Sequence, residues 1–322
     1  MKQSLTKLIP IFLLALIIIS FINIISGPYP ALKGLFNEDR FGLQIILNLR
    51  LPPLILALTS GILLSLSGAI FQSILSNPLA DPYILGISGG AASFIVFSNL
   101  LKIPQEFPYT FLIGFLGASL NAFLVYFLSA KNGKIKKTKL LLTGIILNGF
   151  YSAIILFFMA LMDQMDLNRF IFWMMGDFSE KTLQESLFFL FISIIFIIPP
   201  FIFHRGFDLL SIGYDTSSTS GLDTNKFIIY SYLNGSLLSA LSVSFVGIIG
   251  FVGLIIPNII RIFFTSKHNL LLPFSALGGA IFLILSDLIT RYKFFQNVPV
   301  GAISAMIGVP FFIYLLRKNG ND

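Results

Sequence analysis

The sequence predicts an all-α polytopic membrane protein, a bundle of ten helices that span a lipid bilayer. Hydrophobic residues make up 56% of the 322 residues and charged residues only 11%, with a mean hydropathy of +0.91, whereas soluble domains carry about 25% charged residues. The apolar residues form continuous runs, without the alternation typical of a transmembrane β-barrel. Because a bilayer forces every backbone polar group to pair within the chain, such runs predict helices.

Charged residues, prolines and glycines divide the apolar sequence into ten expected spans. These are 8–26, 49–75, 83–100, 108–129, 140–162, 186–203, 225–247, 249–265, 270–290 and 299–317. An even number of spans places both termini on one side. That side carries 13 of the 21 Lys and Arg residues, which predicts that both termini are cytoplasmic.

The first expected span follows Lys2 and Lys7, as the apolar part of a signal peptide would. Its apolar run is long, however, and no small-x-small cleavage motif follows it. We therefore expect a retained first helix.

The second expected span carries Gly61, Ser65 and Gly68 on one helix face, at spacings of four and three residues. Small residues placed in this way allow two helices to approach closely. The same face could also line a wide path against a partner chain. The pattern leaves both interpretations open.

The stretch SNPLADPYILGISGGAA, residues 76–92, interrupts the apolar sequence after the second span. Pro78 and Pro82 prevent the helix from continuing. Asn77 and Asp81 are expected to accept hydrogen bonds from nearby backbone groups. This stretch is either a plain turn between two spans or part of an element that moves.

Two other breaks differ in charge. The segment 131–139, KNGKIKKTK, is expected to be a topology signal beside anionic membrane lipid rather than a nucleic-acid site. The segment 162–185 is acidic and amphipathic and contains Trp173, the single tryptophan. We expect it at the outer interface.

The break between the seventh and eighth spans is only GIIG, 247–250, so these spans could also form one broken helix.

No motif for catalysis, metal binding or a cofactor is present. The chain has no cysteine and lacks the GxxxxGK[ST], HExxH and GxSxG patterns, and its two histidines, His204 and His268, stand beside basic residues at expected span ends. Asp287 is the one deep ionisable candidate, and Arg291 lies one turn away, able to pair with it. The chain is therefore not expected to be an enzyme, and any transport it performs would draw its energy from elsewhere.

Several motifs in one order resemble a known family. Arg50-Leu51-Pro52 and SGAIFQSILSNPLADPYILGISGGA are followed by segments at 141–153, 172–179, 250–261, 270–291 and 298–318. From Arg50 onward the chain resembles the FecCD-type permeases of ABC importers, which carry iron–siderophore complexes, haem or vitamin B12.

The resemblance implies one permease domain, 1–322, of the type II ABC importer kind in the cytoplasmic (inner) membrane. It implies a homodimer or heterodimer of permeases with the path between them, two cytoplasmic ATP-binding subunits and an extracytoplasmic substrate-binding protein. A ferric siderophore is the expected cargo, with haem and vitamin B12 as alternatives. A self-contained secondary carrier is the competing class, and a sensor or scaffold without transport is a third, weaker interpretation.

The resemblance also implies roles for particular residues. Asn77 and Leu79 fall at the inner narrowing of the path, and Gly61, Ser65 and Gly68 are the candidate path-lining residues. A cytoplasmic segment, 205–226, would couple the permease to its ATPase through two short helices. The residues that match this pattern are Leu210, Gly213, Asp215 and Gly221.

Two departures from the family pattern accompany these matches. Ser218 and Ser220 replace the usual Arg and Leu of the coupling segment, which could also be an ordinary solvated loop. Arg50 and Arg291 match positions that dock the binding protein, while Pro53 stands where another Arg is frequent. Arg suits carboxylate partners; without the resemblance, both arginines would be interpreted as interfacial anchors.

Overall fold

The computed structural model describes residues 8–27, 40–131, 134–179, 181–292, 294–295 and 298–319. Helices make up nearly all of its regular structure, and a two-residue ladder between β1 and β2 is the exception within these ranges. The predicted fold class, an all-α bundle of apolar helices, is confirmed.

Each of the ten expected spans overlaps one apolar helix. These helices are α2 (Ile9–Ile25), α5 (Leu51–Leu75), α6 (Ile87–Leu100), α7 (Tyr109–Ser129), α8 (Lys137–Met159), α10 (Leu183–Ile202), α13 (Thr224–Val246), α14 (Val252–Phe263), α15 (His268–Thr290) and α16 (Val300–Asn319). Within the described residues, six helical segments are long and apolar enough to cross a membrane, while α2, α6, α14 and α16 contribute shorter apolar stretches.

Short elements connect the long helices. They are α4 (Arg40–Ile45), the π-helix η1 (Ile46–Arg50), the 3₁₀-helix η2 (Pro82–Leu85), β1 (Ala130–Lys131), β2 (Lys134–Ile135), α9 (Gln164–Met174), α11 (His204–Ile212) and α12 (Tyr214–Thr219). The helix α9 forms in the amphipathic segment that contains Trp173. The β1–β2 hairpin was not expected in the basic segment 131–139, of which residues 132 and 133 lie outside the described ranges.

The second span begins earlier than its proline pair suggests. The elements α4, η1 and α5 run on without a break, giving a 34-residue apolar segment from Gly42 to Leu75 rather than one that starts at residue 49. Pro52 and Pro53 are accommodated because they stand in the first turn of α5, after the π-turn, where a missing N–H costs least.

Helix α5 is the centre of the bundle. It packs against α10, α13, α14 and α15, and every one of its residues is buried except Leu51, Ile55, Leu58 and Ile62. Outer helices such as α7 and α8 instead leave apolar side chains exposed, among them Phe127 and Ile146. Such side chains are suited to face lipid.

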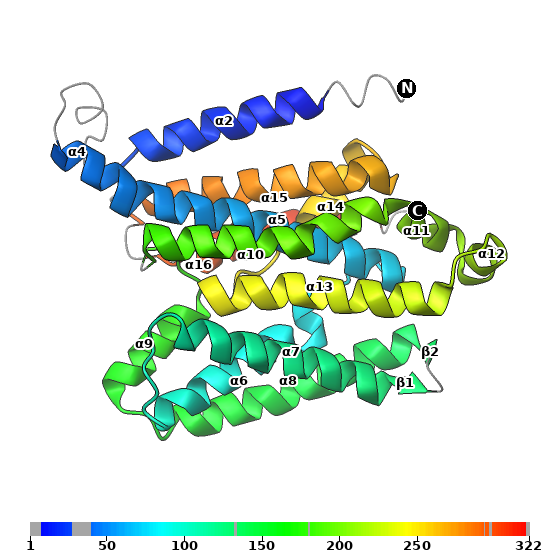
Figure 1. The fold of residues 1–322 in the computed structure, drawn as a ribbon, viewed down its shortest axis with the longest axis horizontal. Helices are drawn as coiled ribbons and strands as arrows, with labels where there is room; N and C mark the ends of the chain where they lie inside the picture. The colour runs from blue at the N-terminus through cyan, green and yellow to red at the C-terminus, as the bar shows by residue number, and fades with distance from the viewer. Residues whose placement is uncertain are drawn as a thin grey trace.

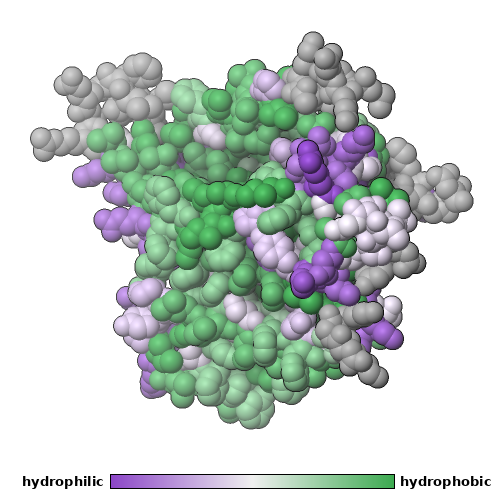
Figure 2. All heavy atoms as spheres, turned by 45° about the vertical axis from the view of Figure 1, so that its right-hand side comes forward, coloured by the Kyte–Doolittle hydropathy of each residue, from purple (hydrophilic) through white to green (hydrophobic). Residues whose placement is uncertain are grey.

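The bundle has two distinct ends (Figure 1). One end carries α11, α12 and the β1–β2 hairpin, and α2 begins there; we call it the α11 end. The opposite end carries α4 and α9, and we call it the α9 end. Polar residues gather toward the two ends and apolar residues cover the surface between them (Figure 2), as expected for a chain that crosses a bilayer.

The seventh and eighth spans are separate helices. Helix α13 ends at Val246, Gly247 has φ of +76°, and Phe251 has φ of +70° immediately before α14. A side chain at Gly247 would overlap the carbonyl oxygen of Trp173. The break therefore comes from a tight contact with α9 as well as from the flexibility of the glycine.

Candidate gate and coupling site

The segment after α5 is a compact loop held by its own side chains. Ser76 ends α5 in the left-handed conformation, with φ of 49°. The Asn77 Oδ1 accepts a hydrogen bond from the backbone N–H of Leu79 at 2.9 Å, and the Asp81 Oδ1 accepts one from that of Tyr83 at 2.8 Å. These bonds confirm that Asn77 and Asp81 satisfy local backbone groups, as the sequence predicts.

Three asparagine side chains from three different helices hold this segment, residues 76–86, to the bundle; we call it the gate loop. Each donates a hydrogen bond from its Nδ2 to a backbone carbonyl oxygen of the loop. The three bonds are Asn258 in α14 to Pro78 at 2.7 Å, Asn148 in α8 to Tyr83 at 2.8 Å, and Asn121 in α7 to Leu85 at 2.9 Å.

Sequence reasoning passed over these three asparagines. Each is a single amide within an otherwise apolar run, and a buried amide must find a partner. A lone amide in an apolar run thus indicates a buried hydrogen bond. The sequence does not show that all three amides bond to the same loop. Movement of the whole loop relative to α7, α8 and α14 would therefore have to break or shift all three bonds.

The gate loop combines a charged group with an exposed apolar one. Leu79 is 40% exposed, while the neighbouring Ala80 is buried. Burial raises the pKa of Asp81, which lies between the α5 and α6 spans, to about 6, and the hydrogen bond from the Tyr83 N–H opposes that shift in part. The loop thus presents two exposed apolar side chains, Leu79 and Ile84, on a tightly bonded frame.

The small residues of α5 lie in contacts with other helices of the same chain. A side chain at Gly61 would overlap the backbone of Gly279 in α15, and one at Gly68 would overlap the backbone of Gly253 in α14. Ser65 is buried beside Gly279, and its Oγ donates to the Gly61 carbonyl oxygen at 2.7 Å. The structure gives these residues the packing role that the sequence left open.

Because Gly61, Ser65 and Gly68 are buried within one chain, they lie away from any surface that a second permease could contact in this conformation. A path-lining role for them stays a prediction. The sequence could not separate the two roles, because small residues suit both close packing and a wide path.

The segment 205–226 contains the two short helices α11 and α12 at the α11 end. Leu210 is buried in the main core, so it anchors α11 rather than presenting a surface. Gly213 (φ +136°) separates the two helices and Gly221 (φ +86°) follows α12. Asp215 belongs to α12, but its side chain lies outside what the structure describes. Residues 218–221 are exposed.

The two arginines with an expected docking role are both buried at the α9 end. Arg291 Nη2 lies 2.7 Å from Asp287 Oδ2, and its Nη1 donates to the Asn23 carbonyl oxygen at 2.8 Å. Asn23 Nδ2 also donates to Asp287 Oδ2 at 2.8 Å. The Arg50 guanidinium packs against Gly27, and its Nε has no hydrogen-bond partner among the described residues.

The described residues contain no group of three or more His, Asp or Glu side chains placed to hold a metal ion. A pocket of about 540 Å³ lies at the α9 end between α6, α7, α9 and α13, lined in part by Asn99, Arg169 and Trp173.

Comparison with known proteins agrees along nearly the whole chain. The FecCD transport family matches residues 9–318. The Fe(3+)-citrate import system permease protein YfmD of Bacillus subtilis is 34% identical, covering 99% of this chain and 98% of the relative. The cobalamin import system permease protein BtuC of Halobacterium salinarum is 34% identical, covering 92% of this chain and 82% of the relative.

A solved structure has the same fold. It is an inward-facing conformation of a metal-chelate type ABC transporter, with a TM-score of 0.86 and 28% sequence identity. The similarity covers 97% of this chain and 99% of that one.

Proposed function

The chain belongs to the FecCD transport family, and from that premise we propose that it is the transmembrane subunit of an ATP-driven importer for a ferric siderophore. The observation that carries the proposal is the match of residues 9–318 to the family. A 34% identity to a permease named for Fe(3+)-citrate import supports an iron chelate as cargo.

The proposed complex contains this permease paired with an identical or homologous one, with the path between the two chains. Two cytoplasmic ATP-binding subunits supply the energy, and a separate binding protein delivers the cargo. The α11 end faces the cytoplasm in this proposal, together with both termini. The exposed stretch 218–221, which covers the last residues of α12 and the two that follow, suits contact with an ATP-binding subunit.

We propose that the gate loop forms the inner gate. Asn77 shapes the turn through its bond to the Leu79 N–H, and Leu79 presents its exposed side chain to the path. Two apolar side chains of this kind, one from each permease, would close a passage to water and small ions while offering a large chelate no charged group to bind.

The binding protein is proposed to dock at the α9 end through Arg50 and Arg291. In this chain Arg291 forms a buried ion pair with Asp287. To dock, Arg291 would have to leave Asp287 and pair with a carboxylate of the binding protein. Arg50 is buried as well, with 6% exposure, and its Nε has no hydrogen-bond partner among the described residues. Charge pairs of this kind favour fast association as well as affinity.

A vesicle uptake experiment tests the proposal. The purified permease is reconstituted with its ATP-binding subunit and binding protein, and uptake of a labelled ferric siderophore, Fe(3+)-citrate, haem and cobalamin is compared with and without internal ATP. ATP-dependent accumulation of an iron chelate is the expected result.

Other outcomes separate the parts of the proposal. Accumulation of cobalamin, the cargo named for a relative of equal identity, would replace the iron chelate while keeping the importer. ATP hydrolysis that ignores the loaded binding protein, together with no uptake of any cargo, would contradict the importer itself. Uptake without ATP would favour a secondary carrier.

A further inference from the structure

A buried histidine joins the short helix α11 to the start of a spanning helix. His268, the first residue of α15, is 3% exposed. Its backbone N–H and its ring Nδ1 both lie 2.8 Å from Asp208 Oδ1 in α11. The Asp208 carboxylate accepts both bonds and lies at the N-terminus of α15, where an acidic side chain is electrostatically favourable. Helix α11 is thus bonded directly to the first residue of α15.

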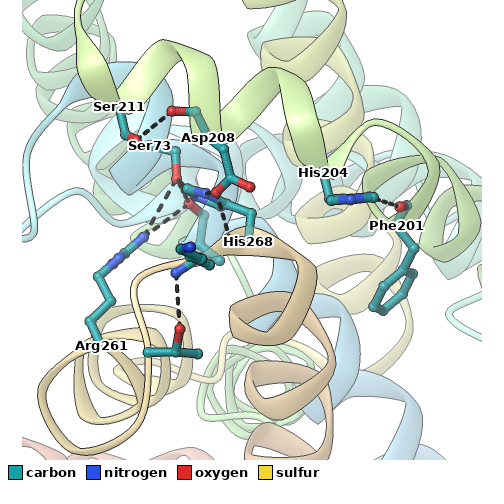
Figure 3. Close-up of polar contacts among 10 residues, drawn as sticks. Ser73, Phe201, His204, Asp208, Ser211, Arg261 and His268 are labelled. Carbon is teal, nitrogen blue, oxygen red and sulfur yellow. Dashed lines mark hydrogen bonds and ion pairs between the residues drawn. The ribbon is translucent and has the colours of Figure 1, made fainter. Parts of the chain in front are cut away.

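The opposite side of the same imidazole bonds to α5. His268 Nε2 lies 2.7 Å from Ser73 Oγ, two residues before α5 ends. Figure 3 shows Asp208, His268 and Ser73 in this order. The three residues come from three helices, and the imidazole ring is the sole side chain that bridges Asp208 and Ser73 among the hydrogen bonds of the described residues.

The network continues from Ser73 into α14. Arg261 donates from Nη1 to Gln72 Oε1 and reaches Ser73 Oγ at 3.5 Å from Nη2. Gln72 Nε2 in turn donates to the Gly253 carbonyl oxygen at 3.0 Å. The last turn of α5 is therefore bonded to α14 as well as to α15.

The final step reaches the gate loop. Arg261 Nη1 lies 3.5 Å from Asn258 Oδ1, and Asn258 Nδ2 donates to the Pro78 carbonyl oxygen at 2.7 Å. A continuous set of hydrogen bonds therefore runs from Asp208 on α11 through His268, Ser73, Arg261 and Asn258 to the gate loop.

We infer that Asp208, His268 and Ser73 form a coupling link that transmits movement of α11 to the gate loop during the ATPase cycle. The inference rests on the proposed function, since it assumes that an ATP-binding subunit moves α11. A displacement of α11 acts on α15 and α5 through a single rigid ring. Packing also ties α11 to the bundle through Phe207 and Leu210, but apolar contacts can slide, whereas two hydrogen bonds on opposite sides of an imidazole cannot stretch far without breaking.

Substitutions at His268 can break either half of the link. His268→Asn places an amide nitrogen near the position of Nδ1, which preserves the bond to Asp208 and removes the bond to Ser73. His268→Gln places its amide nitrogen near the position of Nε2, which preserves the bond to Ser73 and removes the side-chain bond to Asp208. Ser73→Ala removes the far end of the link without changing α11 or α15.

The other histidine provides a matched control. His204 is the first residue of α11, and its Nδ1 bonds at 2.8 Å to the carbonyl oxygen of Phe201, three residues earlier in the chain. Figure 3 shows His204 turned away from the network. His204→Ala removes a histidine from the same end of the bundle but leaves the link intact.

The gate loop itself can report the movement. The chain contains no cysteine, so Leu79→Cys provides a unique thiol at an exposed position. The rate at which a maleimide labels this thiol is measured in the reconstituted permease–ATPase complex, without nucleotide and with the ATPase trapped by vanadate. ATP hydrolysis and uptake are measured on the same preparations, and thermal unfolding shows whether each variant is folded.

The link predicts that vanadate trapping changes the labelling rate in the wild-type background and with His204→Ala. His268→Asn, His268→Gln and Ser73→Ala should abolish that change and lower uptake per ATP hydrolysed by roughly tenfold, a typical size for coupling between two sites. Basal ATP hydrolysis should be unchanged. Wild-type uptake by either single His268 variant would contradict a link that needs both bonds.

Two results separate failure of the link from failure of the proposed function. A wild-type complex whose labelling rate and hydrolysis ignore nucleotide and binding protein would overturn both. A responsive wild type with an equally responsive, folded Ser73→Ala variant would overturn the link alone. A structural role without coupling would lower the unfolding temperature of the variants while leaving uptake per ATP at its wild-type value.

Discussion

The two ends of this bundle use similar buried polar chemistry for different purposes. At the α9 end, Asp287, Arg291 and Asn23 bond to one another between α2 and α15. At the α11 end, the bonds that start at Asp208 and His268 pass through α11, α15, α5 and α14 to the gate loop. The first set closes on itself, whereas the second connects the surface of the bundle to a loop.

This difference shows that the role of a buried polar residue depends more on which elements its hydrogen bonds join than on its residue type. A closed cluster holds two helices of this chain together. An open network joins an element that an outside partner can move to a distant loop. A contiguous network of this kind can carry coupling between two sites when its elements have two discrete arrangements. We therefore expect substitutions at Asp287 to act on stability and those at Asp208, His268 and Ser73 to act on coupling.

The largest expected effect is at Asp287. Asp287→Ala leaves the Arg291 guanidinium buried and unpaired, so we expect the free energy of unfolding to fall by about 3–5 kcal/mol. Thermal unfolding in detergent measures the loss. Asp287→Asn keeps a carbonyl acceptor for Arg291 and Asn23 and should cost less.

The same two variants test the secondary-carrier interpretation. If Asp287→Asn unfolds at the wild-type temperature and keeps its partners but no longer supports uptake, the carboxylate takes part in transport and the two ends do not differ as described.

A smaller effect is expected where α5 and α14 touch. A methyl group at Gly68 would overlap the carbonyl oxygen of Gly253, and neither backbone can move without shifting a whole helix. Gly68→Ala should therefore lower the free energy of unfolding by about 1–3 kcal/mol. The matched control is Gly149→Ala in α8, where a methyl group would meet no atom within 4 Å. This control should be neutral or slightly stabilising, because alanine favours helix more than glycine. Equal effects of the two changes would contradict the packing role of the small residues.

The smallest effect concerns pH and the gate loop. Burial raises the pKa of Asp81 from 3.8 to about 6, so the folded state binds this proton more tightly than the unfolded state. The Asp81 contribution to stability is therefore greatest near pH 4, falls as the pH rises to about 6, and is constant above that value. The total change should be about 1–2 kcal/mol, after allowance for partial exposure of the loop.

Comparison with Asp81→Asn isolates this contribution from other titrating groups. The Asn oxygen can still accept from the Tyr83 N–H without carrying a charge, so the variant should be more stable than the wild type at pH 7.5 and equal to it near pH 4. Denaturant unfolding at several pH values measures the difference. A difference that does not depend on pH would show that the Asp81 carboxylate is not titrating in this range.

Local patterns in the sequence were sufficient to predict the positions of the ten apolar helices and the turn chemistry of Asn77 and Asp81. They were also sufficient to place a short amphipathic element beside Trp173. The start of the second span was predicted too late, because the proline pair resembles a helix boundary and the π-turn before it has no sequence signal. The roles of Gly61, Ser65 and Gly68 stayed open because the sequence does not show which helix lies opposite.

What the sequence determined by itself is the class of protein: its apolar runs, its lack of catalytic motifs and its ordered family motifs each lie within short stretches that need no partner to be interpreted. Tertiary structure alone decided how the polar residues inside those runs are connected. His268 meets Asp208 across 60 residues and Ser73 across 195, and three asparagines from three helices reach one loop. A buried polar side chain must find a partner, but the identity of that partner depends on helix packing, which leaves no trace in the local sequence.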